Sequence, residues 1–378
     1  MQLVPPDAFV QKEVCLDPVL FLFGGDIEQH AGFGRYGRGN NDGNIRMPGS
    51  EFMAKDETRV LVFHHQVEDG QIRPGLFDDA FGFLLGVRRD GQEPHLFNGA
   101  QKIFAQTPAP EKIAVVWLDM TSPEKLVEEL TALMAAGHND WYFLLSESQK
   151  PADVDALAAF AAANGKLYFG SMTDTAFAAL DDTTLALDRA VILCHKNAAT
   201  QYPAEAWVGR CAPELPGSIT WKFKSLSGVS ESGYTPTEIA AIKEKHGNVV
   251  VSQGGILHTT EGTVLSGEFI DVIRSQDWVK ARIAEGVFRL LATSPKVPYD
   301  DRGIAMVLAE VQGVMQQATA QGIIARDADG NGMWSVTAPK RSEIAANNIA
   351  NRVLPDVKFE FTLAGAIHSV TVRGVISV

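Results

Sequence analysis

The chain has 378 residues, a length that usually forms two or three domains. Hydrophobic residues make up 46% and charged residues 21%, a composition that supports sizeable globular cores. The net charge of −13 at pH 7 argues against a nucleic-acid-binding surface, which requires a basic face. Cys15, Cys194 and Cys211 lie far apart without a CxxC pair, which argues against a zinc knuckle or a disulfide framework and favours a reducing compartment.

The first 110 residues show little regular pattern. Residues 1–20 contain two consecutive prolines and predict an extended arm. They lack the basic start and apolar core of a signal peptide, and no run in the chain is long enough to span a membrane. Residues 21–110 are predicted to form a β-rich irregular region, because short strand-like runs alternate with loops rich in glycine and asparagine. These runs lie at 19–23, 60–63 and 81–87.

Strand and helix patterns alternate between residues 111 and 215. A helix is predicted from Ser122-Pro123 to Ala136, and a second one is predicted over 151–163, followed by Asn164-Gly165. The alternation predicts an α/β domain with a mostly parallel sheet. The apolar runs typical of its buried strands lie at 113–118, 141–145, 166–169 and 190–194.

A third domain is predicted over residues 216–378. A capping box at Thr235–Glu238 starts one helix, Ser275 is expected to cap a second, and Gly322 is expected to end a third. These three helices are predicted over 235–247, 276–292 and 304–318. Two strands are predicted to follow, over 358–363 and 367–378.

Two loop motifs suggest ligand sites but lack an essential part. Residues 32–37 match the G-x-G-x-x-G dinucleotide pattern, yet the Asn- and Gly-rich sequence that follows cannot form the required helix, which favours a flexible loop. Residues 327–332 resemble the first half of a calcium-binding loop. Ala338 occupies the position of the bidentate carboxylate, so a turn is predicted instead.

Other reactive side chains also have simpler explanations. Neighbours on a strand point to opposite faces, so His64-His65 is not expected to share a metal, and Cys194-His195 is not expected to act as a nucleophile and base. The acidic pairs are expected to be solvated caps at turns or helix starts. They are Asp78-Asp79, Asp181-Asp182 and Asp300-Asp301. The sequence therefore predicts no catalytic residue, no cofactor and no metal.

The carboxyl-terminal strand allows two interpretations. It could pair within its own domain, or it could add to a sheet of a neighbouring subunit, because an alternating strand that stays apolar leaves an edge to be paired. One face carries Val370, Val372, Ile376 and Val378, and the other carries Thr371, Arg373, Val375 and Ser377.

The order of several segments resembles that of contractile bacteriophage tail sheath proteins. The resemblance runs from about residue 100 to residue 378. It rests on the segments at 101–106, 108–114, 139–143, 204–209 and 216–229, and on a set of sheath-core positions. These positions are Pro216, Gly217, Thr220, Trp221, Lys222, Gly228, Gly267, Phe269, Asp271 and Trp278.

The resemblance implies a mixed α/β fold with a central α/β layer and a C-terminal sheath core domain that strands from other subunits complete. It implies a structural, non-enzymatic subunit that assembles with itself into stacked six-fold rings around a tail tube and contracts to drive the tube through the host envelope. Residues 1–20 would form one donated arm. The candidates for the other donated strand are Ile367, Val370, Thr371, Val372, Arg373, Val375 and Ile376.

The partners implied are further copies of the chain, the tail tube protein, and the baseplate and tail terminator proteins, without direct contact to nucleic acid and without membrane insertion. The expected location is the virion tail, after assembly in the host cytoplasm. Two other functions stay open. One is a baseplate or tail component that shares the fold but does not polymerise. The other is a soluble α/β enzyme with a site at the carboxyl ends of strands, near Asp119 and Ser146.

Overall fold

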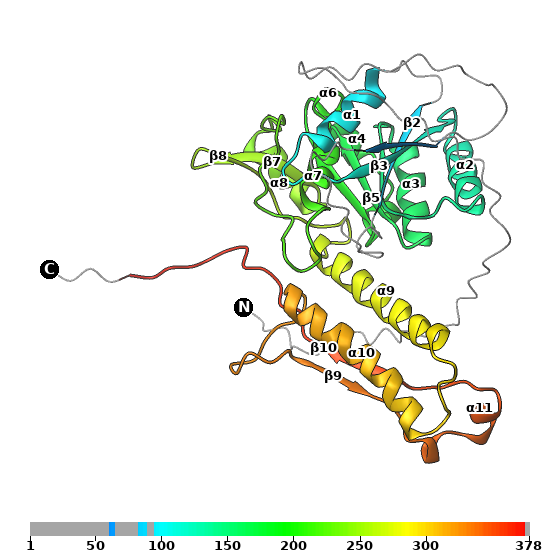
Figure 1. Ribbon diagram of the computed structural model, residues 1–378. Coiled ribbons are helices and arrows are strands. Elements are labelled where there is room, and N and C mark those ends of the chain that lie inside the picture. The colour runs from blue at the N-terminus through cyan, green and yellow to red at the C-terminus, as the bar shows by residue number, and fades with distance from the viewer. Residues whose placement is uncertain (1–59, 65–81, 89–93, 375–378) are drawn as a thin grey trace, which may run out of the picture. The chain divides into compact units, whose positions relative to one another are not determined.

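A computed structural model describes residues 60–64, 82–88 and 94–374. The predicted arm at 1–20, the strand candidate at 19–23, the glycine loop at 32–37 and the Asp78-Asp79 pair lie outside these residues. The described part has the predicted mixed α/β fold (Figure 1).

The centre of the fold is an eight-stranded sheet with the order β1-β3-β2-β4-β5-β6-β7-β8. The six inner strands run parallel, while β1 and β8 pair antiparallel at the two edges. The strands are β1 Val60–His64, β2 Gly82–Arg88, β3 Lys112–Leu118, β4 Trp141–Ser146, β5 Leu167–Met172, β6 Ala190–Cys194, β7 Asn248–Gln253 and β8 Ile256–Thr259.

The four strands predicted for residues 111–215 are present as β3, β4, β5 and β6, but the sheet extends beyond that segment on both sides. β1 and β2 come from the region predicted to be β-rich and irregular, and they confirm the strand-like runs at 60–63 and 81–87. β2 inserts between β3 and β4. β7 and β8 come from the region beyond residue 216. In β7 only Asn248, Val249 and Val250 are fully buried, so its apolar run is too short to be recognised as a sheet strand from sequence.

Helices cover both faces of this sheet, and each face has its own core (Figure 1). On one face lie α1 Pro94–Phe104 and α7 Pro203–Cys211. The helices on the other face are α2 Pro123–Ala135, α3 Pro151–Ala163, α4 Asp174–Ala178 and α8 Pro236–Glu244. Two short helices, α5 Asp182–Leu185 and α6 Ala198–Gln201, lie in the connections.

The predicted helix starts are confirmed for α2 and α8. Ser122 accepts a hydrogen bond from the Lys125 N–H, and Thr235 and Glu238 form a reciprocal capping box. Helix α1 was not predicted, since its sequence contains asparagine and glycine, and its stability comes from burying Ala100 and Ile103 against the sheet.

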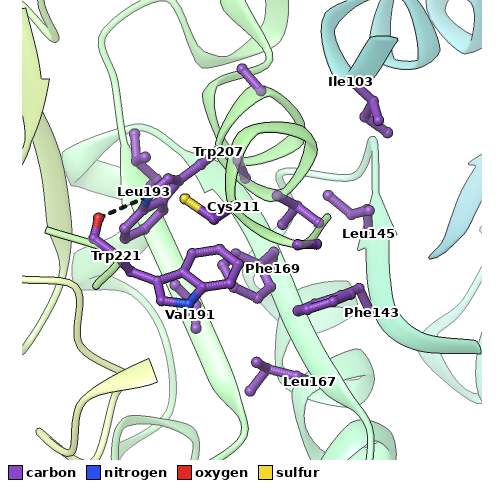
Figure 2. Packing of buried hydrophobic residues seen from close by; sticks show 14 of the residues in the cluster. Ile103, Phe143, Leu145, Leu167, Phe169, Val191, Leu193, Trp207, Cys211 and Trp221 are labelled. Atoms are coloured by element: carbon purple, nitrogen blue, oxygen red, sulfur yellow. Dashed lines mark hydrogen bonds between the residues drawn. The ribbon is translucent and has the colours of Figure 1, made fainter. Parts of the chain in front are cut away.

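Four aromatic rings form the centre of the core under α7 (Figure 2). The Trp221 ring lies 5.0 Å from Phe169, 5.6 Å from Trp207 and 6.0 Å from Phe143 between centroids. The indole N–H of Trp207 donates to the Trp221 carbonyl oxygen at 3.0 Å. Each such pair contributes about 0.5–1.5 kcal/mol beyond the burial of its area, so these contacts fix the segment around Trp221 against the sheet.

The remaining elements form a helical hairpin and a two-stranded sheet around a third core. Helix α9 spans Ile270–Thr293 and α10 spans Asp301–Gln321. At the start of α10 the Asp300 carboxylate accepts a hydrogen bond from the Gly303 N–H, and at its end Gly322 has the left-handed conformation. Strands β9 Trp334–Thr337 and β10 Lys358–Phe361 pair antiparallel. Between them lie a 3-10 helix at Arg341–Glu343 and α11 Ala346–Ala350.

The predicted start of α9 was wrong. Ser275 is buried inside the helix instead of capping it, because Ile270 and Ile273 extend the helix backwards into the core beneath α7. Thus α9 begins in the core of the large sheet and continues into the core of the hairpin. None of the helices in the described segments combines the length and the apolar character that a membrane crossing requires.

Candidate functional site

Residues 364–374 form no regular secondary structure, and almost all of their side chains are exposed. The predicted strand at 367–378 does not form over 367–374, and Ala364 is the last residue with a backbone hydrogen bond to another described residue, Ile323, at 2.9 Å. The side chains of Ile367, Val370 and Val372 are 82%, 75% and 84% exposed. Of the two interpretations, pairing within the subunit gains no support in the described part, because none of its strands pairs with this segment.

The loop with the calcium-like sequence forms a turn, as predicted. The Asp327 carboxylate accepts hydrogen bonds from the N–H groups of Asp329 at 3.0 Å and Asn331 at 2.8 Å, so it is used to close its own turn. Within the described segments, no group of three or more His, Cys, Asp or Glu residues is arranged to hold a metal ion.

The sheath-core positions divide among several places in the fold. Trp221 lies in the core under α7, whereas Trp278 lies in the core of the helical hairpin. Gly217 has a φ of 83°, and an added Cβ would lie 2.6 Å from the backbone nitrogen of Ile323, so only glycine allows this close approach. Pro216 precedes this glycine in a turn.

The two remaining glycines and Asp271 support local structure. The Gly228 carbonyl oxygen accepts a hydrogen bond from the Lys102 ammonium group, and an added Cβ at Gly267 would contact the His246 ring. Asp271 lies in the first turn of α9, where burial raises the pKa of its carboxyl to about 6.

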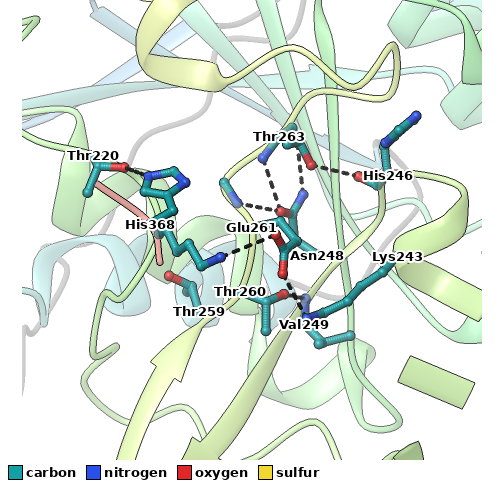
Figure 3. Close-up of polar contacts among 12 residues, drawn as sticks. Thr220, Lys243, His246, Asn248, Val249, Thr259, Thr260, Glu261, Thr263 and His368 are labelled. Carbon is teal, nitrogen blue, oxygen red and sulfur yellow. Dashed lines mark hydrogen bonds and ion pairs between the residues drawn. The ribbon is translucent and has the colours of Figure 1, made fainter. Parts of the chain in front are cut away.

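Thr220 and Phe269 contact His368 of the C-terminal segment, and Figure 3 shows Thr220 beside His368. The Thr220 hydroxyl lies 2.9 Å from His368 Nε2, and the Phe269 ring lies 4.9 Å from the His368 ring between centroids. Lys222 forms an ion pair with Glu261 at 3.2 Å. His368 was not among the predicted site residues, because a single histidine in an alternating run carries no recognisable signal.

The side chains considered as candidate catalytic groups are buried or take part in local hydrogen bonds. Cys194 is a buried core residue, and burial raises the pKa of its thiol. His195 Nδ1 accepts a hydrogen bond from the Asn197 N–H at 2.9 Å, and burial lowers the pKa of its ring. Asp119 accepts two hydrogen bonds from Thr121, and Ser146 accepts one from the Ser148 N–H. Each of these acceptors supports its own loop.

One carboxyl group on α7 is buried beneath the helix. Glu205 is 2% exposed and accepts a hydrogen bond from the Ser171 hydroxyl at 2.9 Å. Burial raises its pKa to about 7, and the charge of Glu147 acts in the same direction. Between about pH 4.5 and pH 7, Glu205 therefore keeps its proton in the folded state, whereas in the unfolded state, with an ordinary pKa near 4.5, it has lost that proton.

We expect this group to make stability depend on pH. Its contribution is complete below about pH 4.5 and is lost as the pH rises through about 7. Replacing Glu205 with Gln should raise the free energy of unfolding at pH 8 by about 2–3 kcal/mol and leave it nearly unchanged at pH 4.5. Denaturation by urea at both pH values measures this difference, and an equal effect at both would contradict the assignment.

Part of the chain matches a known protein family. Residues 270–375 match the family model described as "E217 tail sheath protein gp31-like, C-terminal domain". No curated protein matches the chain.

Two solved structures share the fold at low sequence identity. One is a chain of the anti-feeding prophage (AFP) baseplate, six-fold symmetrised, with 12% identity, a TM-score of 0.62, and coverage of 88% of this chain and 100% of that one. The other belongs to the PVC sheath complex of an extracellular contractile injection system in the contracted state, with 10% identity, a TM-score of 0.55, and coverage of 88% and 98%. The resemblance to tail sheath proteins is thereby confirmed over residues 270–375, which match a sheath C-terminal domain, and the chain shares its fold with these two structures.

Proposed function

We propose that this chain is the sheath subunit of a contractile injection system. Copies assemble into stacked six-fold rings around a tail tube, remain linked through exchanged strands, and contract to drive the tube through a target envelope. The other partners are the proteins that close the two ends of the sheath, the baseplate and the tail terminator. The match of residues 270–375 to a tail sheath domain supports this function.

The observation that carries the proposal is the exposed C-terminal segment. Val370 and Val372 leave most of their surface in water, although their alternation with polar residues is typical of a strand with one buried face. Ile367, which an extended strand would place on the opposite face, is exposed as well. Burying one such side chain contributes about 1.5–3 kcal/mol, and a second copy of the chain can supply both the apolar surface and the unpaired strand edge.

The two-stranded sheet of β9 and β10 is the acceptor that we propose. A sheet of two strands alone is only marginally stable in water, and a third strand with an apolar face stabilises it. One face of this sheet already packs against the core of the helical hairpin, through the side chains of Trp334, Val336, Phe359 and Phe361. A donated strand would extend this covered face.

The baseplate component is the second candidate, since one of the similar structures is described as a baseplate. Such a protein would have the same fold but would form a single ring or a cap. A catalytic function has no support in the described residues, because the candidate groups near Asp119, Ser146 and His195 take part in local hydrogen bonds.

The purified full-length protein is expected to form hollow cylinders with six-fold symmetry. Negative-stain microscopy and sedimentation over a wide concentration range test this directly. Cylinders support the sheath function, whereas single rings that never stack favour the baseplate component. A compact monomer at every concentration would contradict both candidates.

A further inference from the structure

His368 differs from every other residue of the C-terminal segment. Of residues 364–374, it alone has a partly buried side chain, while its ten companions are exposed. Ile367 directly before it is 82% exposed, although isoleucine is much more apolar than histidine. The hydrophobic effect alone would bury the isoleucine, so specific contacts select the histidine.

Three side chains hold the imidazole, and we name them the His368 cradle: Thr220, Phe223 and Phe269. The Thr220 hydroxyl hydrogen-bonds Nε2 at 2.9 Å. Phe269 and Phe223 meet the ring edge to face, with interplanar angles of 88° and 83° and centroid distances of 4.9 and 6.3 Å. This orientation is the favourable one for aromatic pairs.

The cradle exists because of an unusual backbone conformation. Phe223 has a φ of 61°, in the left-handed region that aromatic residues rarely adopt. Its N–H donates to the Thr259 carbonyl oxygen at 2.9 Å, which holds the conformation and leaves the ring 46% exposed. Such conformations cost free energy and are enriched at functional sites.

The charges around the cradle favour the neutral imidazole. Lys222 and Lys224 of the same loop repel a proton on His368, while Glu261 opposes them. Glu261 is shared with the ammonium groups of Lys222 and Lys243, which reduces its effect. The other titratable groups on the elements that form this region are His258, whose ring contacts that of Phe223, and Glu268 and Asp271, which flank Phe269.

We propose that His368 is an intramolecular anchor that holds the start of the C-terminal segment in the cradle and fixes the point from which the following residues are donated to another copy of the chain. The donation itself rests on the proposed function. The anchor is a separate property of the single subunit, because all of its contacts lie within one chain.

The anchor shortens the free part of the segment. Within the described part, the chain without the anchor is free over residues 365–374, and with it only over the six residues 369–374, which span about 20 Å when fully extended. The effective concentration of a tethered segment falls roughly as the −3/2 power of the free length, so releasing residues 365–368 lowers it about twofold. Strand exchange should slow by the same factor.

The anchor should also respond to pH. Burial and the two lysines lower the pKa of His368 in the anchored state. In the released segment the imidazole has the ordinary histidine pKa of about 6.5. Anchoring is therefore complete above about pH 6.5 and weakens as the pH falls through the lowered pKa. A contact made only of aromatic packing would not show this dependence.

Distances between two spin labels in the monomeric subunit test the anchor. The labels are placed at Thr371→Cys and at Glu244→Cys on α8, with Cys15→Ser, since Cys194 and Cys211 are buried. The variants His368→Ala and Phe269→Ala remove the two sides of the contact, and Ser369→Ala is the matched control on the neighbouring exposed residue. Samples are diluted below the concentration of assembly and measured at pH 8 and pH 5.5.

The expected result is a narrow distance distribution at pH 8 for the parent and for Ser369→Ala, and a broad one for His368→Ala and for Phe269→Ala. The distribution of the parent should be broader at pH 5.5 than at pH 8. Light scattering should then show assembly about twofold slower for His368→Ala. A broad distribution in the parent at pH 8, or faster assembly of His368→Ala, would overturn the anchor. Failure of the parent to assemble, together with a narrow distribution, would refute strand donation and leave the anchor intact.

Discussion

Deletion of residues 370–378 is expected to abolish polymerisation while the subunit stays folded and soluble, with the midpoint of thermal unfolding nearly unchanged. Val370 and Val372 are 75% and 84% exposed, so their removal takes almost no buried area from the subunit. The backbone of 370–374 likewise has no hydrogen bond to another described residue. What the deletion removes is the strand that a second copy would bury.

The alternative, a strand that pairs within its own subunit, gives the opposite result. Loss of several buried aliphatic side chains would cost about 1.5–3 kcal/mol each, against a total stability of about 5–15 kcal/mol. The truncated protein would then unfold or aggregate. Melting of the monomeric fraction and particle images, recorded on the same samples, separate the two cases.

A point substitution tests the same strand with less change. Val372→Pro removes one backbone donor and fixes φ, which a central strand does not tolerate, so assembly should be lost. Val372→Thr is the matched control, because it keeps the branched side chain and the backbone N–H. Normal cylinders from Val372→Pro would show that this residue is not in a paired strand.

The elements that sequence analysis predicted well are those whose signals are local. The caps at Ser122 and Thr235 were visible because a side-chain oxygen and a proline stand next to each helix start. The inner strands β4, β5 and β6 are buried along their whole length, so their apolar runs are continuous.

The elements that were missed depend on contacts distant in the chain. Helix α1 is fixed by α7, more than a hundred residues later, with an added Cβ at Gly209 lying 2.5 Å from the Ile103 carbonyl oxygen. Strands β7 and β8 lie at one end of the sheet and have few buried residues. Their membership depends on the pairing of β7 with β6 and of β8 with β7, which no local pattern encodes.

The contacts around α9 were equally hidden from sequence analysis. The early start of the helix depends on Ile270, Ile273 and Arg274 entering a core built by α7 and the sheet. The His368 contact joins Thr220 to a residue 148 positions later. The sheath-core positions were chosen by resemblance, and the structure gives several of them distinct roles in packing, in close approach and in the cradle.

A cluster of charged residues joins α9 to the large sheet. The Asp277 carboxylate accepts two hydrogen bonds from the Arg189 guanidinium, at 2.6 and 2.7 Å, and one from the Tyr142 hydroxyl at 2.5 Å. One turn earlier, buried Arg274 donates to the carbonyl oxygens of Cys211 and Ala212 at the end of α7. Because α9 continues into the helical hairpin, these contacts fix the direction in which the hairpin leaves the sheet.

Asp277→Ala is therefore expected to lower the free energy of unfolding by about 2–4 kcal/mol. Breaking a buried ion pair costs about 3–5 kcal/mol, and the 17–19% exposure of the two side chains reduces this cost. Chemical denaturation at pH 7 measures the change. Lys280→Ala, on an exposed position of the same helix, should stay within about 0.5 kcal/mol of the parent.

Asp277→Asn separates the loss of charge from the loss of the acceptor. The amide oxygen can still accept from Tyr142 and from one nitrogen of Arg189, so this variant should lose less than half as much stability as Asp277→Ala. A helical assembly repeats one subunit geometry, so we expect Asp277→Ala to form fewer and less regular cylinders under conditions where it is still folded. If Asp277→Ala assembled normally and lost as little stability as Lys280→Ala, the cluster would not be the joint between α9 and the sheet.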